Sequence, residues 1–349
     1  MRQSVGMLIP VWFREETGED GCYELLGRAL EDVETFVQPQ NLLLIVDGCP
    51  VAEEPTRRLQ SELAERLGQP CRLRVLDENL GKGGVLVEGF RELLGNAALR
   101  WFSVRDDDGD HSIWDLPHLF RLGEQMRAAA TLRSSDTSLR STSEPTDLIV
   151  ICGRRASLDR PLGTWRAEYE RLVAELVWEA LKAALARQGR ALNTQYLNAY
   201  SRYPDLQSGY KLYSRAAAQL AADALEREAA SHPAYRLLGW GVEVVAAVEV
   251  LLAGGLWGEM MRVAYETQPQ TTFDEAARWE EYGREAAWAL RRLGLPPAAA
   301  LQLLDNALPQ CRLYQGRAGR EELLKMRAFV ARELGLTEPT SEVSSPEFF

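Results

Sequence analysis

The chain lacks paired cysteines, long apolar runs and an excess of basic residues, and each absence excludes a class of protein. Its five cysteines are odd in number, scattered and without a CxxC pair, which argues against a disulfide framework and against a zinc site. We therefore expect reduced thiols and a cytoplasmic location. The formal net charge of -11 at pH 7 argues against a nucleic-acid partner, which would require a basic face for phosphate contacts.

Apolar runs are too short for a membrane protein. No run approaches the roughly 20 residues that span a bilayer. The best candidate, residues 242–256, contains Glu243 and Glu249 and therefore predicts a buried helix. The apolar run at residues 7–13 is too short for a signal peptide and is followed at once by charged residues. We expect at most peripheral contact with a membrane.

Short apolar runs alternate with helical periodicity over the first hundred residues, which is typical of a layered α/β fold. With 46% hydrophobic residues in 349, the chain can bury a core of one large domain or two. Ligands of open α/β sheets bind just outside the carboxyl ends of the strands, so the residues that follow each strand are the candidates for a site. The apolar runs predict strands at residues 6–11, 42–46, 73–76 and 101–104.

An acidic cluster follows the fourth predicted strand. Asp106, Asp107 and Asp108 stand together, and Asp110 follows after one glycine. Such charges repel one another near a low-dielectric core unless a metal or another cation offsets them. Carboxylate oxygens select Mg²⁺ or Mn²⁺ over zinc, so the cluster predicts one of these ions. For an isolated run of this kind, a solvated acidic turn is the alternative.

A glycine-rich turn with one lysine, residues 79–84, lies between the third and fourth predicted strands. Its glycines let backbone amides approach a phosphate, and Lys82 at the start of a helix adds positive potential. A plain turn with a solvated lysine is the alternative. The turn is not a P-loop, because Gly83 stands where Ser or Thr is required, and no GxGxxG follows the first strand. We predict a diphosphate held between a metal and this turn.

Four segments occur along the chain in a defined order: Ile9-Pro10-Val11, Val46-Asp47-Gly48, Asn79-Leu80-Gly81-Lys82-Gly83 and Asp106-Asp107-Asp108. This order resembles the nucleotide-sugar half of family-2 glycosyltransferases, which have the GT-A fold. The run that begins at Asp106 is similar to the DADxQHPPExxP run of dolichyl-phosphate mannosyl- and glucosyltransferases. Asp110 stands where that subgroup has Gln.

Three later segments extend the resemblance over roughly residues 5–270. They are Ile151-Cys152-Gly153-Arg154, which resembles a strand ending in GSR, residues 204–212, which resemble a DxQCGFKL segment, and residues 239–244, where an acid follows an aromatic residue. The resemblance implies an α/β fold of the GT-A type, a Rossmann-like mixed sheet flanked by helices. The composition after about residue 270 adds a C-terminal helical appendage.

The resemblance also implies a role for each matching residue. The residues implied to contact the nucleotide sugar are Pro10, Val11, Asp47, Asn79, Gly81, Lys82, Asp106, Asp107 and Arg154. Those implied to hold Mg²⁺ or Mn²⁺ are Asp106, Asp108 and Asp110. The acceptor would be bound by Gln207 and Lys211. The candidates for the catalytic base are Glu243 and Asp205.

Departures from the family pattern leave the acceptor side open. One acid, Asp47, ends the second strand where the family has two. Glu243 stands where close relatives have Asp, and a structural carboxylate at a helix start is an equal interpretation. Without the resemblance, structural ion pairs would be the expectation for Lys211 and Arg154.

The predicted organisation has three parts. They are a GT-A domain at residues 1–270, divided into a nucleotide-sugar half at 1–119 and an acceptor half at 120–270, a helical appendage at 271–336 and a disordered tail at 337–349. A Ser- and Thr-rich loop is expected at residues 134–146. Aromatic residues of the appendage would pack internally or form a homodimer contact.

The predicted function is transfer of one sugar from a UDP- or GDP-linked donor to a hydroxyl or phosphate acceptor. The acceptor would be a polyprenyl phosphate or a small soluble molecule. A non-catalytic nucleotide-sugar-binding protein is the alternative from another class. A sugar nucleotidyltransferase is a third option, but it would need a glycine-rich basic loop where this chain has Pro10-Val11-Trp12-Phe13.

Overall fold

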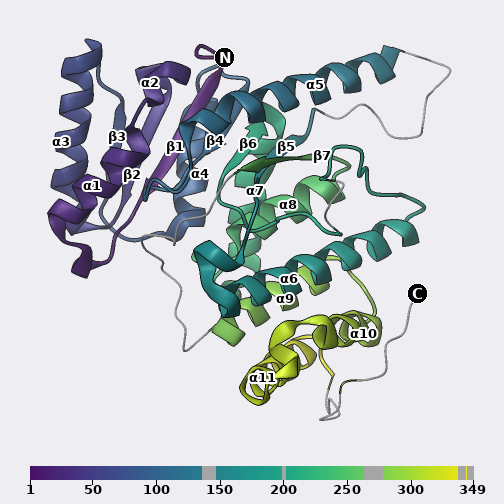
Figure 1. The fold of residues 1–349 in the computed structure, drawn as a ribbon. Helices are drawn as coiled ribbons and strands as arrows, with labels where there is room; N and C mark the ends of the chain where they lie inside the picture. Colours follow the sequence, from purple (N-terminus) through teal and green to yellow (C-terminus); the bar gives the residue numbers. More distant parts are fainter. Residues whose placement is uncertain (136–146, 199–201, 263–277, 337–342, 344–349) are drawn as a thin grey trace. The chain divides into compact units, whose positions relative to one another are not determined.

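Two compact units make up the chain in the computed structural model shown in Figure 1. The structure describes residues 1–135, 147–198, 202–262, 278–336 and residue 343. As far as they are described, residues 1–155 and 208–262 form the first unit, and residues 156–207 join the C-terminal helices in the second. Residues 136–146 of the predicted loop and all of the predicted tail except Val343 lie outside the described residues.

A mixed sheet of seven strands organises the described part of the first unit, in the order β3-β2-β1-β4-β6-β5-β7. β1 is parallel to β2 and β4, and β2 is parallel to β3. β6 is antiparallel to β4 and β5, and β5 is parallel to β7. The strands are β1 (Val5–Val11), β2 (Leu42–Asp47), β3 (Arg72–Leu76), β4 (Trp101–Val104), β5 (Ile149–Arg155), β6 (Lys211–Ser214) and β7 (Leu256–Arg262).

The four strands predicted between residues 6 and 104 are confirmed as β1 to β4. β2 and β4 are buried along their whole length, which is why they form continuous apolar runs in the sequence. β3 lies at the edge of the sheet and is only half-buried. The α/β prediction, a mixed sheet flanked by helices, is therefore confirmed, and the arrangement is consistent with the GT-A type.

Helices of the first unit cover both faces of the sheet. α1 packs against α3, whereas α4 packs against α7, and α7 packs against α8. Right-handed crossovers place α1 and α3 on one face and α4 on the other, because β2 and β4 lie on opposite sides of β1. The helices are α1 (Gly18–Leu30), α2 (Val33–Phe36), α3 (Pro50–Leu67), α4 (Gly81–Leu94), α5 (Leu116–Ser135), α7 (Arg215–Ser231) and α8 (Val242–Leu252).

The buried helix predicted at residues 242–256 is shorter than expected. α8 ends at Leu252, and Gly254 then adopts a left-handed conformation with φ of 85°. The chain turns there and enters β7 at Leu256. A bilayer-spanning helix is absent from the described part of the chain.

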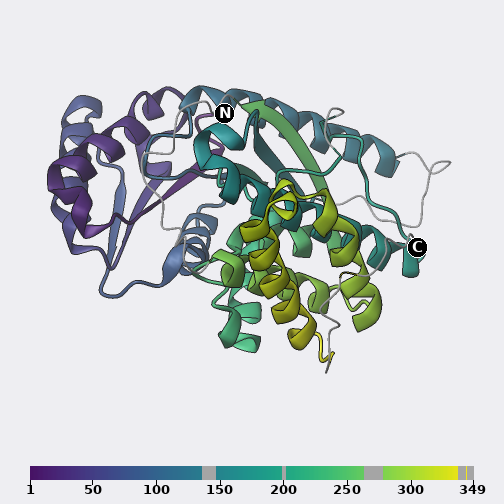
Figure 2. The ribbon, with the colours of Figure 1, turned by 60° about the horizontal axis from the view of Figure 1, so that its bottom comes forward.

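The second unit is helical. α9 packs against α6 and α11, and α10 packs against α6. Figure 2 shows α10 and α11, which are also in contact, side by side in yellow-green and yellow. Tyr169 and Tyr282 stack with ring centroids 5.1 Å apart, so aromatic residues pack inside this unit. The helices are α6 (Asp159–Arg187), α9 (Arg278–Arg292), α10 (Pro297–Ala307) and α11 (Arg317–Glu333).

Residues 156–207 leave the sheet after β5 and return just before β6. The two ends of this excursion are joined within the first unit. The Gly153 N–H donates to the Tyr210 carbonyl at 2.9 Å, and the Ser208 hydroxyl donates to the Gly153 carbonyl at 2.7 Å. The sequence placed this segment in the acceptor half of a single domain, whereas the compact units group it with the C-terminal helices. The predicted domain boundaries stay a prediction.

Candidate functional site

Three parallel strands deliver polar residues to one edge of the sheet. β1 lies between β2 and β4, and the chain crosses to these neighbours on opposite faces. Such a switch point is where open α/β sheets bind ligands, at the carboxyl ends of the strands. Asp47 ends β2, Trp12 follows β1, and Asp106 follows shortly after β4.

The end of β2 packs tightly against the glycine-rich turn. A carboxylate oxygen of buried Asp47 accepts a hydrogen bond from the Leu80 N–H at 2.7 Å. Gly48 has φ of 53°, and a Cβ there would lie 2.3 Å from the backbone of Glu78 and Asn79. Burial raises the pKa of Asp47, while the turn's backbone N–H groups act in the opposite direction. Asp47 therefore holds the glycine-rich turn against the end of β2.

The glycines of the turn serve chain packing. Gly81 has φ of 75°, and a Cβ there would lie 2.6 Å from the Leu238 carbonyl oxygen. The Gly83 N–H donates to that same carbonyl at 2.7 Å, and the Gly81 N–H donates to the Asn79 side chain at 2.9 Å. These two amides are thus engaged within the protein, where the sequence predicted amides for a phosphate. The close approach instead brings the start of α8 to the turn.

Lys82 joins the turn, the acidic cluster and α8. Its Nζ lies 2.7 Å from Asp106 Oδ1 and 2.8 Å from Glu243 Oε1. Burial by itself would lower the pKa of Lys82, but these carboxylates raise it above its ordinary value. A Cβ on Gly209 would lie 2.7 Å from Asp106 Oδ2 and 2.9 Å from Lys82 Nζ. The structure therefore brings three predicted site residues together, and Gly209 leaves room for them.

The remaining aspartates of the cluster are held by separate partners. Asp107 accepts a hydrogen bond from the Trp12 N–H at 2.8 Å, and Asp108 accepts one from the Asp110 N–H at 3.1 Å. Asp110 Oδ2 lies 3.3 Å from the guanidinium of buried Arg262 on β7. We call Asp106, Asp107, Asp108 and Asp110 the rim aspartates.

Positive charge offsets the rim aspartates incompletely. Burial opposes ionisation of Asp106, but Lys82 holds its pKa below the usual range. Burial, followed by the charge of Asp106, raises the pKa of Asp108 to about 6. Burial also raises the pKa of Asp107 well above its ordinary value. The cluster therefore contains more buried negative charge than its own cations neutralise.

Three residues beside the cluster, His111, Arg105 and Arg262, were not predicted as part of the site. The ring of buried His111 accepts a hydrogen bond from the Asp106 N–H at 3.1 Å and stacks on Tyr210, with centroids 5.0 Å apart. Burial lowers the pKa of His111, so the ring is neutral. The guanidinium of Arg105 donates to the carbonyls of Ala29 and His111. The position of His111 directly after the aspartates was the available signal, whereas Arg262, 152 positions after Asp110, offered none.

Other predicted residues of the first unit have structural partners. Arg154 pairs with Glu259 at 3.0 Å across β5 and β7. Lys211 is buried on β6, and its ammonium donates to the Ser208 carbonyl. These contacts match the structural alternative, although they leave roles in substrate binding untested. Pro10 and Val11 end β1 at the edge that carries the rim aspartates.

Two predicted acceptor-side residues belong to the second unit. The Gln207 side chain donates to Glu285 on α9 at 2.9 Å. Asp205 is buried, two positions before it. The structure therefore does not bring Asp205 and Gln207 together with Lys82 and Asp106 within one compact unit, and their roles stay predictions.

A preformed metal cage is absent from the described residues, among which no group of three or more His, Cys, Asp or Glu side chains is arranged to hold a metal ion. Lys82 and Arg262 already pair with Asp106 and Asp110. Magnesium in nucleotide sites is commonly held by one or two carboxylates together with substrate phosphates. The buried carboxylate of Asp108, which has other carboxylates close by, is suited to bind such an ion. Phosphates of the substrate would supply further ligands.

Comparisons with known proteins identify no family. No protein-family profile matches the chain, and no curated protein matches it. A solved structure of a mycobacterial protein is similar with a TM-score of 0.43 and 18% sequence identity, covering 84% of this chain and 76% of that one. The structure of S. aureus TarS residues 1–349 is similar with a TM-score of 0.36 and 12% identity, covering 95% of this chain and 89% of that one. Likenesses at this level assign no function.

Proposed function

We propose that the chain is a metal-dependent glycosyltransferase that moves one sugar from a nucleoside-diphosphate sugar to a hydroxyl or phosphate acceptor. The observation that carries this proposal is the contact of Lys82 with both Asp106 and Glu243 at the switch point of the sheet. One cation, a surplus of buried carboxylates and the strand ends meet there. The order of sequence motifs that resembles family-2 glycosyltransferases supports the same function.

The donor side consists of Asp47, the turn, Lys82 and the rim aspartates. In this proposal, Lys82 contacts the diphosphate, and Asp108 with Asp106 holds Mg²⁺ or Mn²⁺. The ion would neutralise charge on the departing nucleoside diphosphate. Asp107 positions the start of the β1 loop through Trp12, and Asp47 positions the turn through Leu80.

Glu243 is the better placed of the two candidates for the base, because it lies beside Lys82 within the same unit. During transfer, the bond from the sugar carbon to the diphosphate oxygen breaks, and a bond from that carbon to the acceptor oxygen forms. A hydroxyl acceptor loses its proton to the Glu243 carboxylate, whereas a phosphate acceptor needs no base. Burial opposes ionisation of Glu243, but Lys82 and Lys211 lower its pKa. A diphosphate that draws Lys82 away would make Glu243 a stronger base.

Thermal unfolding of the full chain with nucleotides tests the donor site. UDP or GDP with Mn²⁺ should raise the melting temperature, and EDTA should remove the effect, because a ligand that binds only the folded state stabilises it. A ligand at 100 times its Kd adds about 2.7 kcal/mol. Asp108→Ala should abolish the metal-dependent part, and Glu53→Ala, which changes an exposed carboxylate on α3, should retain it.

Equal stabilisation of Asp108→Ala and the unaltered chain would show that the metal assignment is wrong. Donor turnover then separates an enzyme from a binding protein. With Mn²⁺, the enzyme should release UDP or GDP slowly from its donor sugar even in the absence of an acceptor. Tight, metal-dependent binding without release or transfer would favour the non-catalytic nucleotide-sugar-binding protein.

A further inference from the structure

His111 faces Asp106 through both of its ring nitrogens, a contact to which the proposed donor site assigns no role. The side chain is 2% exposed. Its Nδ1 accepts the Asp106 N–H at 3.1 Å, and its Nε2 lies 3.6 Å from Asp106 Oδ2. The other carboxylate oxygen, Oδ1, lies 2.7 Å from Lys82 Nζ. The carboxylate of Asp106 therefore has a cation at one oxygen and an imidazole facing the other.

The hydrogen bond from the Asp106 N–H determines which ring nitrogen of His111 carries the proton. A nitrogen that accepts a hydrogen bond needs a free lone pair, so Nδ1 is unprotonated. The ring proton is therefore on Nε2, the nitrogen that faces Asp106 Oδ2. A separation of 3.6 Å is too long for a hydrogen bond, so this donor is not engaged by Oδ2 while Lys82 pairs with Oδ1.

Packing holds the His111 ring in this orientation. The ring stacks on Tyr210, with centroids 5.0 Å apart and an angle of 10° between the planes. The His111 carbonyl accepts a hydrogen bond from Arg105. Tyr210 is fully buried, and its hydroxyl makes no hydrogen bond within the described residues, so the face of its ring is the part that supports the imidazole. The Nε2–H is thus kept directed at Asp106.

We infer that His111 is a positioning residue that holds Asp106 for the metal when Lys82 turns to the diphosphate. This inference rests on the proposed donor site. Once Lys82 leaves Asp106, a shift of about 0.5 Å brings Oδ2 within hydrogen-bond distance of Nε2. The other oxygen then remains for Mg²⁺ or Mn²⁺. A neutral N–H orients the carboxylate without cancelling its charge, whereas a cation in the same place would compete with the metal.

Nitrogen-15 NMR of the histidine side chains tests this geometry in the unaltered chain and needs no turnover. The chain has three histidines, so replacing His118 and His232 in turn assigns the signals. His111 should carry its proton on Nε2 in the metal-free chain. Mg²⁺ with UDP or GDP should move the Nε2–H proton signal of His111 downfield, because a hydrogen bond forms there. A proton on Nδ1, or an Nε2–H signal that stays unchanged when the nucleotide binds, would overturn the inference.

Two variants separate the roles of the two nitrogens. The short side chain in His111→Asn can still accept the Asp106 N–H, whereas the longer one in His111→Gln can donate to Oδ2 in place of Nε2. Both lose the stack on Tyr210, so both should melt at a lower temperature. The Kd for Mn²⁺ at saturating UDP or GDP should rise about tenfold or more in His111→Asn and less than about threefold in His111→Gln, because groups that orient a metal ligand contribute about 10- to 100-fold in affinity.

Calorimetric titration of Mn²⁺ into the full chain with nucleotide, against a blank of nucleotide alone, measures these values. His118→Asn is the matched control, because His118 is exposed on α5, and it should bind Mn²⁺ like the unaltered chain. Equal Kd values for His111→Asn and His111→Gln would show a merely structural role. If Asp108→Ala keeps the metal-dependent binding, the proposed metal site is wrong and this inference fails with it. If Asp108→Ala loses that binding while His111→Asn keeps it, only the inference about His111 is wrong.

Discussion

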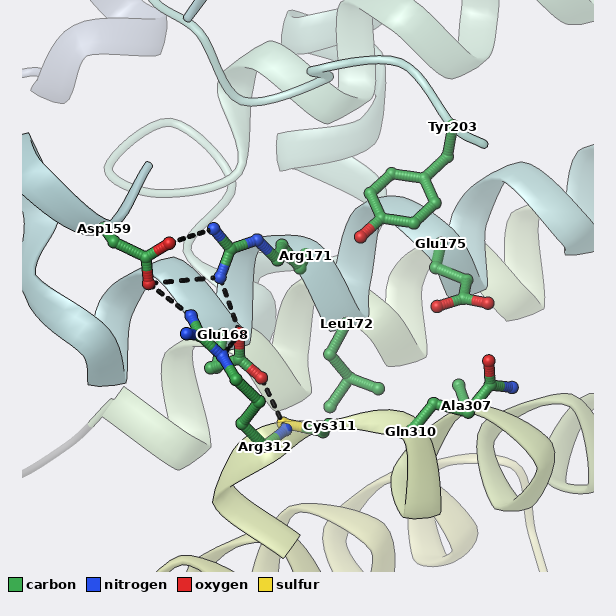
Figure 3. A pocket seen from close by; sticks show the side chains of 10 residues that line it. All are labelled: Asp159, Glu168, Arg171, Leu172, Glu175, Tyr203, Ala307, Gln310, Cys311 and Arg312. Carbon is green, nitrogen blue, oxygen red and sulfur yellow. Dashed lines mark hydrogen bonds and ion pairs between the residues drawn. The ribbon is translucent and has the colours of Figure 1, made fainter. Parts of the chain in front are cut away.

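The rim aspartates and the arginine-paired acids, which are Asp159 and Glu168 with their partners Arg171 and Arg312 (Figure 3), are both acidic clusters, but their charges are balanced differently. Arg171 and Arg312 lie within hydrogen-bond distance of Glu168 and Asp159, and they help to lower the pKa of both acids. Among the rim aspartates, Lys82 and Arg262 pair directly with Asp106 and Asp110 only. The pKa values of Asp107 and Asp108 are raised.

This difference distinguishes carboxylates that stabilise the fold through ion pairs from carboxylates that a bound cation would neutralise. A buried carboxylate with a matched cation strengthens packing, and removing either partner is costly. A buried carboxylate that lacks sufficient neutralisation weakens the folded state, and such groups concentrate at functional sites. The contrast therefore predicts opposite effects when one negative charge is removed from each cluster.

The largest expected effect is the loss of stability in Glu168→Gln. This change removes a charge that binds both Arg171 and Arg312. We expect a loss of about 3 kcal/mol in the free energy of unfolding, the lower end for a broken buried ion pair. Urea denaturation of the full chain, followed by a signal that reports unfolding of the second unit, measures this loss. Glu179→Gln, in an exposed pair with Lys182, should stay within about 0.5 kcal/mol of the unaltered chain.

Asp108→Asn should change stability in the opposite direction. The asparagine keeps an oxygen that can accept the Asp110 N–H, and it removes a charge that burial and Asp106 disfavour. We expect a gain of about 1–2 kcal/mol in EDTA without nucleotide, because one pKa unit corresponds to about 1.4 kcal/mol. The same denaturation assay applies. A loss of stability would show that the rim aspartates are a structural cluster like the arginine-paired acids.

Gly209→Ala should disturb the geometry of Asp106 and Lys82 without changing the charge of the site. The added methyl group would meet Asp106 Oδ2 at 2.7 Å and Lys82 Nζ at 2.9 Å, so their ion pair must shift. We expect binding of UDP or GDP with Mn²⁺ to weaken about tenfold, or about 1.4 kcal/mol. Calorimetry measures the Kd. Gly27→Ala, whose methyl group would meet only Leu59 at 3.8 Å, is the matched control and should bind normally.

The smallest expected effect is a difference in acid sensitivity. Hydrogen bonds from Arg171 and Arg312 lower the pKa of Asp159, so its contribution to stability is present above the unfolded pKa of about 3.9. That contribution is lost as the pH falls through the lower folded value. Between pH 5 and about pH 3, Asp159→Asn should therefore lose less stability than the unaltered chain. Solvent screening limits the difference to a fraction of about 1 kcal/mol. Equal losses in a urea series over this range would contradict the pairing.

The buried parallel strands were predictable from the sequence, whereas β6 and β7, which help to complete the sheet, were not. β1, β2 and β4 are apolar because both faces are covered, so their sequences alone mark them. β6 contains buried Lys211, and β7 contains Glu259 and Arg262. Glu259 and Arg262 pair with residues distant in the sequence, and Lys211 donates to the nearby Ser208 carbonyl. Pairing with β4 and β5 makes these segments strands.

The candidate site was predicted where the topology of the sheet determines position. Residues at or after the ends of the parallel strands β2, β3 and β4 had to reach one edge, and Asp47, Lys82 and Asp106 are found there. The approach of Glu243 depends on packing between Gly83 and Leu238, which no local pattern specifies, and only the family resemblance pointed to it. Gln207 contacts α9, a helix more than 70 residues later in the chain.

The hydrogen bonds that join Gly153 to Ser208 and Tyr210 have a consequence for how this protein could diversify. These hydrogen bonds connect the residues that flank residues 156–207 on either side. Both bonds lie within the unit that contains the sheet. Because the two ends of the insertion are held together, the sheet unit can accept inserted segments of different length, as proteins do with loops between fixed ends. Helical additions of other sizes could occupy this position while the acidic edge of the sheet stays as it is.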